Sequence, residues 1–90
     1  MTDEETELVW LVERSYGHDE DLVTLVFAST DGHFQLKKQL SHNMLYNRTI
    51  TAARAEPRAK LDAVRDDETR QRYAAEASRM AGKHDPDDAV

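Results

Sequence analysis

Residues 22–40 read LVTLVFASTDGHFQLKKQL, and this stretch decides the fold. Its first half, residues 22–27, is an almost unbroken apolar run rich in β-branched and aromatic side chains. Such a run is typical of a strand with little solvent on either face. Asp31-Gly32 follows, a dipeptide that accommodates positive φ angles at low steric cost and so favours a chain reversal. The pattern predicts a strand over 22–28, a turn, and a second strand that begins near His33.

The segment after the turn, residues 33–41, fits two patterns. As a strand it places Phe34, Leu36 and Leu40 on one face, which Lys38 interrupts. As a helix it aligns Leu36, Leu40 and Met44 at a spacing of four residues. We favour the strand because the turn and the preceding strand lie so close in the sequence. Residues 41–47 are then expected to form a turn or a single helical turn.

A further strand precedes this hairpin, at residues 7–14 (ELVWLVER). Alternation places Trp10 with its neighbours Leu8 and Val12 on one face, and Val9 and Leu11 on the other, with Glu7 and Glu13 as charged ends of that second face. The acidic, glycine-containing stretch 15–21 predicts a loop. The strands at 7–14 and 22–28 should therefore pair as an antiparallel hairpin.

The second half of the chain predicts a short strand and a helix. Residues 48–54 (RTITAAR) carry three consecutive β-branched side chains, which favours a fourth strand. Pro57 marks a boundary, and residues 57–64 are expected to form a brief helical turn from which Leu61 and Val64 reach the core.

The C-terminal helix is predicted to begin at Asp66 or Asp67, either of which can cap it. It should bury a stripe of Tyr73, Ala77, Met80 and Ala81, and it should stop near Gly82. These elements define an α+β fold, in which an antiparallel sheet of three to four strands, a hairpin-rich meander, carries one C-terminal helix. The chain is expected to be a single domain over 1–90, with flexible tails at 1–6 and 85–90.

The sheet presents apolar residues on both faces, whereas one helix covers one face. A chain of 90 residues without cysteine has no disulfides to compensate for a small core. We therefore predict a homodimer or a standing protein partner, with Trp10, Phe27 and Phe34 as candidate interface residues. The alternative is that residues 41–64 fold back over the second face.

Charge is distributed unevenly along the chain. The net charge is −6, but residues 1–31 carry −8, residues 32–60 carry +5 and residues 61–90 carry −3. The basic segment 32–60 could form a nucleic-acid or anion surface through five side chains: Lys37, Lys38, Arg48, Arg54 and Arg58. We favour the alternative that these bases pair with acidic residues within the fold, because no known nucleic-acid motif accompanies them.

Acidic residues number 18 against 12 basic ones, arginine outnumbers lysine and cysteine is absent. This usage, together with the segments QLSHNMLYNRTITAA and DETRQRYAAEASRMAGKHDPDD, resembles short uncharacterised acidic proteins of haloarchaea. The resemblance covers about the last two thirds of the chain. It implies a salt-adapted cytoplasm and no particular activity. The acidic start, MTDEETE, lacks the basic region of a signal peptide, which also predicts a cytoplasmic location.

The sequence contains no recognisable catalytic motif. The four histidines lack the spacing that places two ligands on one metal ion, so we expect no metal and no cofactor. Ser41 and His42 are neighbours whose side chains diverge in a strand, and we assign no catalytic residue. The sequence thus predicts a non-enzymatic interaction or regulatory module, with a small nucleic-acid-binding protein as the alternative.

Overall fold

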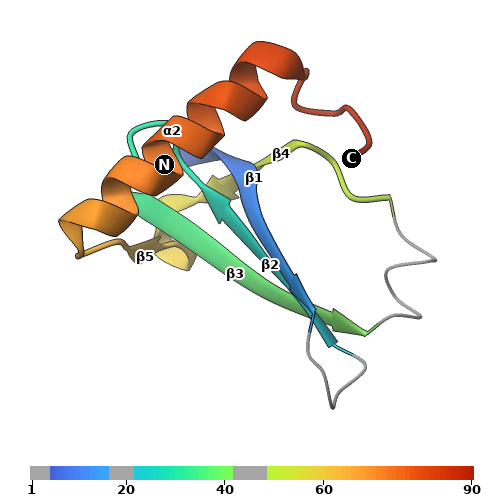
Figure 1. The fold of residues 1–90 in the computed structure, drawn as a ribbon, viewed down its shortest axis with the longest axis horizontal. Coiled ribbons are helices and arrows are strands. Elements are labelled where there is room, and N and C mark those ends of the chain that lie inside the picture. Colours follow the sequence, from blue (N-terminus) through green and yellow to red (C-terminus); the bar gives the residue numbers. More distant parts are fainter. Residues whose placement is uncertain (1–4, 17–21, 42–48) are drawn as a thin grey trace, which may run out of the picture.

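A computed structural model describes residues 5–16, 22–41 and 49–90. Its elements are β1 (Thr6–Tyr16), β2 (Leu22–Ala28), β3 (Phe34–Ser41), β4 (Ala53–Pro57), the 3-10 turn η1 (Arg58–Lys60), β5 (Asp62–Ala63) and α2 (Asp67–Lys83). The strands form one antiparallel sheet in the order β4-β1-β2-β3-β5, and α2 lies across it (Figure 1). The α+β prediction is confirmed. In the described residues the sheet has five strands, more than the three to four predicted.

The central meander forms where the sequence predicts it. β2 matches the predicted strand, and residues 34–41 are a strand, as we favoured. Gly32 takes a φ of +75° in the turn between them, the conformation for which glycine is preferred. Asp31 holds the turn by accepting hydrogen bonds from the Ser29 hydroxyl (2.6 Å) and the His33 amide (2.9 Å). The predicted turn at 41–47 falls mostly outside the described residues, as does most of the loop at 15–21.

A β-bulge in β1 overturns one predicted side-chain orientation. Leu11 pairs with Phe27, but Glu13 pairs with Val26, so Val12 is an extra residue. The bulge moves Glu13 onto the face that α2 covers, where it lies 3.6 Å from Arg72. The prediction that Glu13 shares a face with Val9 and Leu11 was therefore wrong, because strict alternation fails where a bulge inserts one residue.

The fourth strand lies later than predicted. It spans Ala53–Pro57 rather than 48–54, because its register is set by pairing with β1, Trp10 opposite Ala53 and Thr6 opposite Pro57. Tertiary pairing here overrides the local β-propensity of the run at 49–51.

The C-terminal residues pair with the segment before β4. The amides of Ala52 and Ala53 donate to the carbonyls of Asp88 and Pro86, and the Val90 amide donates to the Ile50 carbonyl. The sequence predicted a flexible tail at 85–90. In the structure the backbone of this segment makes these hydrogen bonds, which no side-chain pattern signals.

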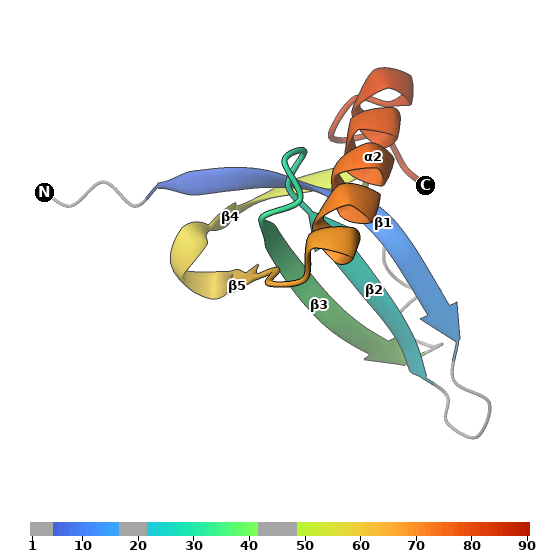
Figure 2. The ribbon, with the colours of Figure 1, turned by 60° about the vertical axis from the view of Figure 1, so that its left-hand side comes forward.

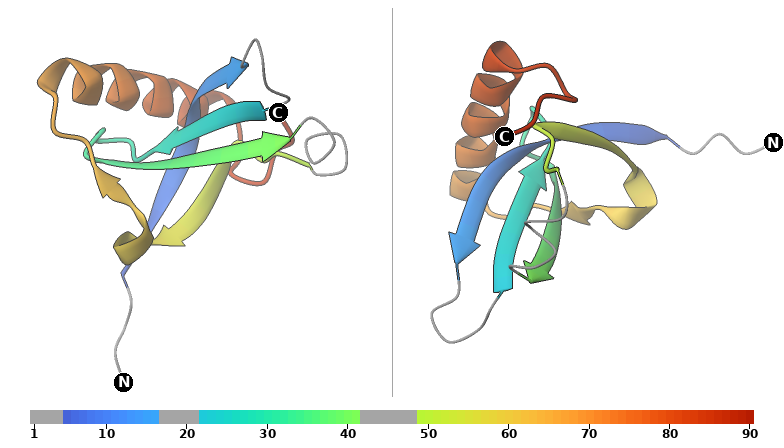
Figure 3. Two further views of the ribbon diagram at one scale, coloured as in Figure 1. Left: turned by 90° about the horizontal axis from the view of Figure 1, so that it is seen from below. Right: turned by 90° about the vertical axis from the view of Figure 1, so that its right-hand side faces the viewer.

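The chain itself covers part of the second face of the sheet. β4 and β5 are opposite edges of the sheet, yet only four residues separate them in sequence, so the sheet must curl to bring its edges together. The segment from β4 through η1 to β5 passes on the side away from α2 (Figures 2 and 3). We call this side the inner face and the opposite side the helix face.

Each face has its own apolar cluster. On the helix face, Trp10, Val26 and Ala28 pack with Tyr73 and Ala77 of α2. The inner face buries Val9, Val23, Leu25, Phe27 and Leu40, with Ile50 and Leu61 packed against them. Residues 50 and 61 thus fold over the second face, the alternative to a dimer that the sequence left open.

The helix α2 begins as predicted. Asp66 caps it by accepting a hydrogen bond from the Thr69 amide. The hydrogen bonds from the Thr69 hydroxyl and the Thr69 amide both lower the pKa of the Asp66 carboxyl. Tyr73 and Ala77 are buried and Met80 packs beside them, whereas Ala81 is exposed. In the described part of the chain, no helix is long and apolar enough to span a lipid bilayer.

Candidate functional site

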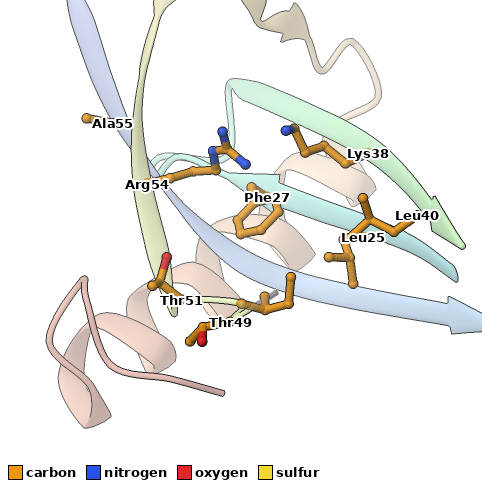
Figure 4. A pocket seen from close by; sticks show the side chains of 9 residues that line it. Leu25, Phe27, Lys38, Leu40, Thr49, Thr51, Arg54 and Ala55 are labelled. Carbon is orange, nitrogen blue, oxygen red and sulfur yellow. The ribbon is translucent and has the colours of Figure 1, made fainter. Parts of the chain in front are cut away.

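A pocket of about 310 Å³ opens on the inner face (Figure 4). Its apolar lining comes from Leu25, Phe27, Leu40, Ile50 and Ala55. Its polar lining comes from Lys38, Thr49, Thr51 and Arg54. The volume is at the lower end of the range of about 300–1,000 Å³ found for small-molecule sites. The curl of the sheet creates the pocket, since β3 and β4 supply its two cations from opposite sides.

Lys38 places a positive charge among apolar neighbours. It lies between Leu36 and Leu40 on β3 and pairs with Leu25, which is fully buried. Lys38 is half-buried, and it has no ion-pair partner among residues 5–16, 22–41 and 49–90. A partly desolvated ammonium without a counter-charge is unfavourable. The pocket is therefore suited to an anion.

Arg54 enters the pocket from β4 and is held in place on two sides. Its guanidinium lies over the Phe27 ring, 5.9 Å from the centroid, a favourable cation–π arrangement. Its Nε donates to Oε2 of Glu56, a residue that is 8 % exposed. The Nε is thus engaged, while the two terminal amino groups have no partner in the described residues.

The wall formed by residues 49–51 depends on the C-terminal residues. The Thr51 hydroxyl donates to the Ala53 carbonyl (2.8 Å), and Thr51 forms an isolated β-bridge with Ala89. The Val90 amide donates a hydrogen bond to the Ile50 carbonyl (2.9 Å). The segment 85–90 thereby fixes one side of the pocket.

The five basic residues that the sequence grouped together do not share one surface. Lys37 is exposed and pairs with Val26, so it faces the helix side of β3, whereas Lys38 faces the pocket. Arg58 lies over the Phe34 ring and pairs with Glu5 and Glu7, both at 2.7 Å. Arg48 lies outside the described residues. Arg54 and Arg58 therefore pair with acidic residues inside the fold.

The candidate interface residues are also distributed over the fold. Trp10 is 5 % exposed and lies on the helix face against α2. Phe27 is 3 % exposed on the inner face, where it supports Arg54. Phe34 is half-buried under Arg58. Burial within the chain thus accounts for the aromatic surface of Trp10 and Phe27.

Histidine and acidic side chains do not gather into a metal site in the part of the chain that the structure describes. His33 is exposed, and His84 Nδ1 lies 3.5 Å from Asp88. His18 and His42 lie outside the described residues. The pKa of Asp31 is lowered, chiefly by the hydrogen bond from the Ser29 hydroxyl, with desolvation acting against it. The hydrogen bonds that cause this shift also hold the turn between β2 and β3.

Sequence reasoning missed the pocket, although it contained the signal. A lysine at an inward position of an apolar strand interrupts the face on which it lies, and Lys38 does so between Leu36 and Leu40. Its partner Arg54 lies 16 positions away on a strand whose bounds were predicted wrongly, so the sequence alone could not bring the two together.

The fold and site together define a small α+β domain with a cationic, apolar-walled pocket on the inner face of a curled antiparallel sheet. The chain belongs to the family of unknown function DUF7967, which matches residues 3–90. No curated protein and no solved structure matches the chain significantly.

Proposed function

We propose that this protein is a non-enzymatic binding module of a salt-adapted cytoplasm, and that the inner-face pocket is its binding site. The observation that carries the proposal is Lys38, a half-buried lysine that lines a partly apolar pocket and has no ion-pair partner in the described residues. An apolar side chain at this position would avoid the partial desolvation of a positive charge. The charge is therefore better explained by a ligand than by folding.

The pocket also suits binding in concentrated salt. Exposed charges are screened within about 3 Å at 1 M salt, whereas partly buried charges are screened much less. Lys38 and Arg54 lie on the wall of a cavity whose floor is apolar, so their attraction for an anion persists where that of a surface patch fades.

The nucleic-acid alternative gains no support from the geometry. A duplex needs cations spread along one face, and here Lys37 and Lys38 face opposite sides of β3 while Arg58 is engaged by two glutamates. The homodimer stays a prediction. Its basis was that a second apolar face of the sheet needs a cover, and Ile50 and Leu61 already pack on that face. Light scattering in molar KCl, with and without a DNA duplex, tests both.

The test of the proposed function compares two neighbouring lysines. We would screen small organic fragments, charged and neutral, against ¹⁵N-labelled protein by NMR in molar KCl, for wild type, Lys38→Met and Lys37→Met. Each variant removes one positive charge from β3, but only Lys38 lines the pocket. We expect fragments to change the amide chemical shifts of Leu25, Leu40 and Ile50 in wild type. Anionic fragments should lose this effect in Lys38→Met but keep it in Lys37→Met. Fragments that shift no pocket amide in wild type would contradict the proposal.

A further inference from the structure

The charges around the pocket define what kind of anion it can hold. Lys38 and Arg54 contribute two positive charges, and Glu56 neutralises one of them through Arg54 Nε. One positive charge is left over. A ligand with a single negative charge would complete the balance, whereas a doubly charged group would bring an unpaired charge into a partly apolar cavity.

The donor geometry suits an anion that presents two oxygens, and the charge balance selects a carboxylate over a phosphate. The Arg54 guanidinium is fixed by Phe27 on its face and by Glu56 at Nε, so its terminal amino groups form the open end of the fork. A guanidinium in a fixed orientation matches the two oxygens of a carboxylate. Figure 4 shows the nitrogen-bearing ends of Lys38 and Arg54 directed toward one another across the Phe27 ring. A carboxylate between them would receive donors from both.

The remainder of the pocket suits an apolar body. Leu25, Leu40 and Ile50 line it beside the cations, and the cavity of about 310 Å³ is small, near the lower limit of about 300 Å³ for ligand sites. Nucleotides and other polyanions are mismatched in charge.

We infer that the ligand is a small monocarboxylic acid with an aliphatic or cyclic body, its carboxylate bound between Lys38 and Arg54 and its body against Leu40 and Ile50. This inference rests on the proposed function, since it names the ligand class of the same pocket. It requires no second copy of the chain, because all of these residues come from one protomer.

The test uses probes that share a cyclohexyl body and differ in their polar group. Cyclohexanecarboxylate, its neutral carboxamide and cyclohexyl phosphate would be titrated into the full chain at neutral pH in molar KCl. NMR shifts of the Leu25, Leu40 and Ile50 signals would report binding. We expect the carboxylate to bind about tenfold or more tighter than the carboxamide, as charge-assisted hydrogen bonds predict. The preference should persist in Lys37→Met and fall to near unity in Lys38→Met.

The possible failures are distinguishable. Equal affinities for carboxylate and carboxamide, or tighter binding of the phosphate, would overturn the carboxylate inference while leaving the pocket as the binding site. If no probe shifts the pocket signals, both the inference and the proposed function fail. Trp10 fluorescence melts check that each variant is folded, since Trp10 lies on the helix face, away from the pocket.

Discussion

Gly32 is the position at which one added carbon should do most damage to the fold. A Cβ there would lie 2.1 Å from the carbonyl oxygen of Arg70 and 3.1 Å from the amide nitrogen of Ala74, both backbone atoms of α2. Ordinary contact begins at 3.4 Å. The Gly32→Ala variant therefore needs α2 to retreat by about 1.3 Å, the difference between 3.4 and 2.1 Å.

Two costs add in this variant. The φ of +75° costs a residue with a Cβ about 1–2 kcal/mol. A retreat of α2 also opens a gap under Tyr73 and Ala77, and a gap of about 0.5–1 Å forfeits a quarter to a half of the dispersion energy of each contact. We expect a total loss of at least about 3 kcal/mol in the free energy of unfolding, a large part of the 5–15 kcal/mol typical of a domain.

Gly82→Ala is the matched control. Gly82 lies inside α2, and a Cβ there meets nothing within 4 Å. Alanine in a helix is favoured over glycine by about 0.5–1 kcal/mol, so this variant should be more stable than wild type. Equilibrium urea unfolding followed by Trp10 fluorescence measures both. A Gly32→Ala variant with the wild-type midpoint, or two variants that shift in the same direction, would refute the reasoning.

Three further predictions concern single polar groups. Gln35→Met should not lower stability, because the Gln35 Oε1 is buried with no hydrogen-bond partner among the described residues; a marked fall in the urea midpoint would contradict this. Asp31 has a lowered pKa, so its contribution to stability is present above its ordinary pKa of 3.8 and is lost as the pH falls through the lower folded value. Asp31→Asn keeps an acceptor oxygen but has no carboxylate to protonate. Its urea midpoint should therefore fall less than that of wild type when the pH is lowered from about 5 to 2; an equal fall in the two midpoints would rule this out. Glu56→Gln should tighten carboxylate binding in the same NMR titration, because it leaves Arg54 hydrogen-bonded but no longer neutralised; weaker binding would show that Glu56 does not limit the charge of the pocket.

Local signals in the sequence predicted the elements that local interactions form. The apolar run of β2, the turn at Asp31-Gly32 and the cap at Asp66 each depend on residues a few positions apart. The five-stranded sheet was predicted only in part. β4 carries alanines and takes its position from β1, and the two residues of β5 pair with β3 without any pattern of their own.

The site was harder to predict because it depends on pairing between distant segments. Adjacency in the sequence suggested that Lys37 and Lys38 act together, whereas strand alternation places them on opposite faces. The bulge at Val12 and the pairing of residues 86–90 with 50–53 arise from tertiary contacts. A cation at an inward strand position was the one local sign of the pocket.

The most direct test of the account is the position of a bound ligand. Protein with ¹³C-labelled Leu, Ile and Val methyl groups would be saturated with cyclohexanecarboxylate, and intermolecular NOEs would be recorded. The account predicts NOEs from the ring protons to Leu25, Leu40 and Ile50, which line the pocket, and none to Val26 or Val64 on the helix face. NOEs to Val26 and Val64 without those to the pocket methyls would place the binding site under α2 and contradict the central claim.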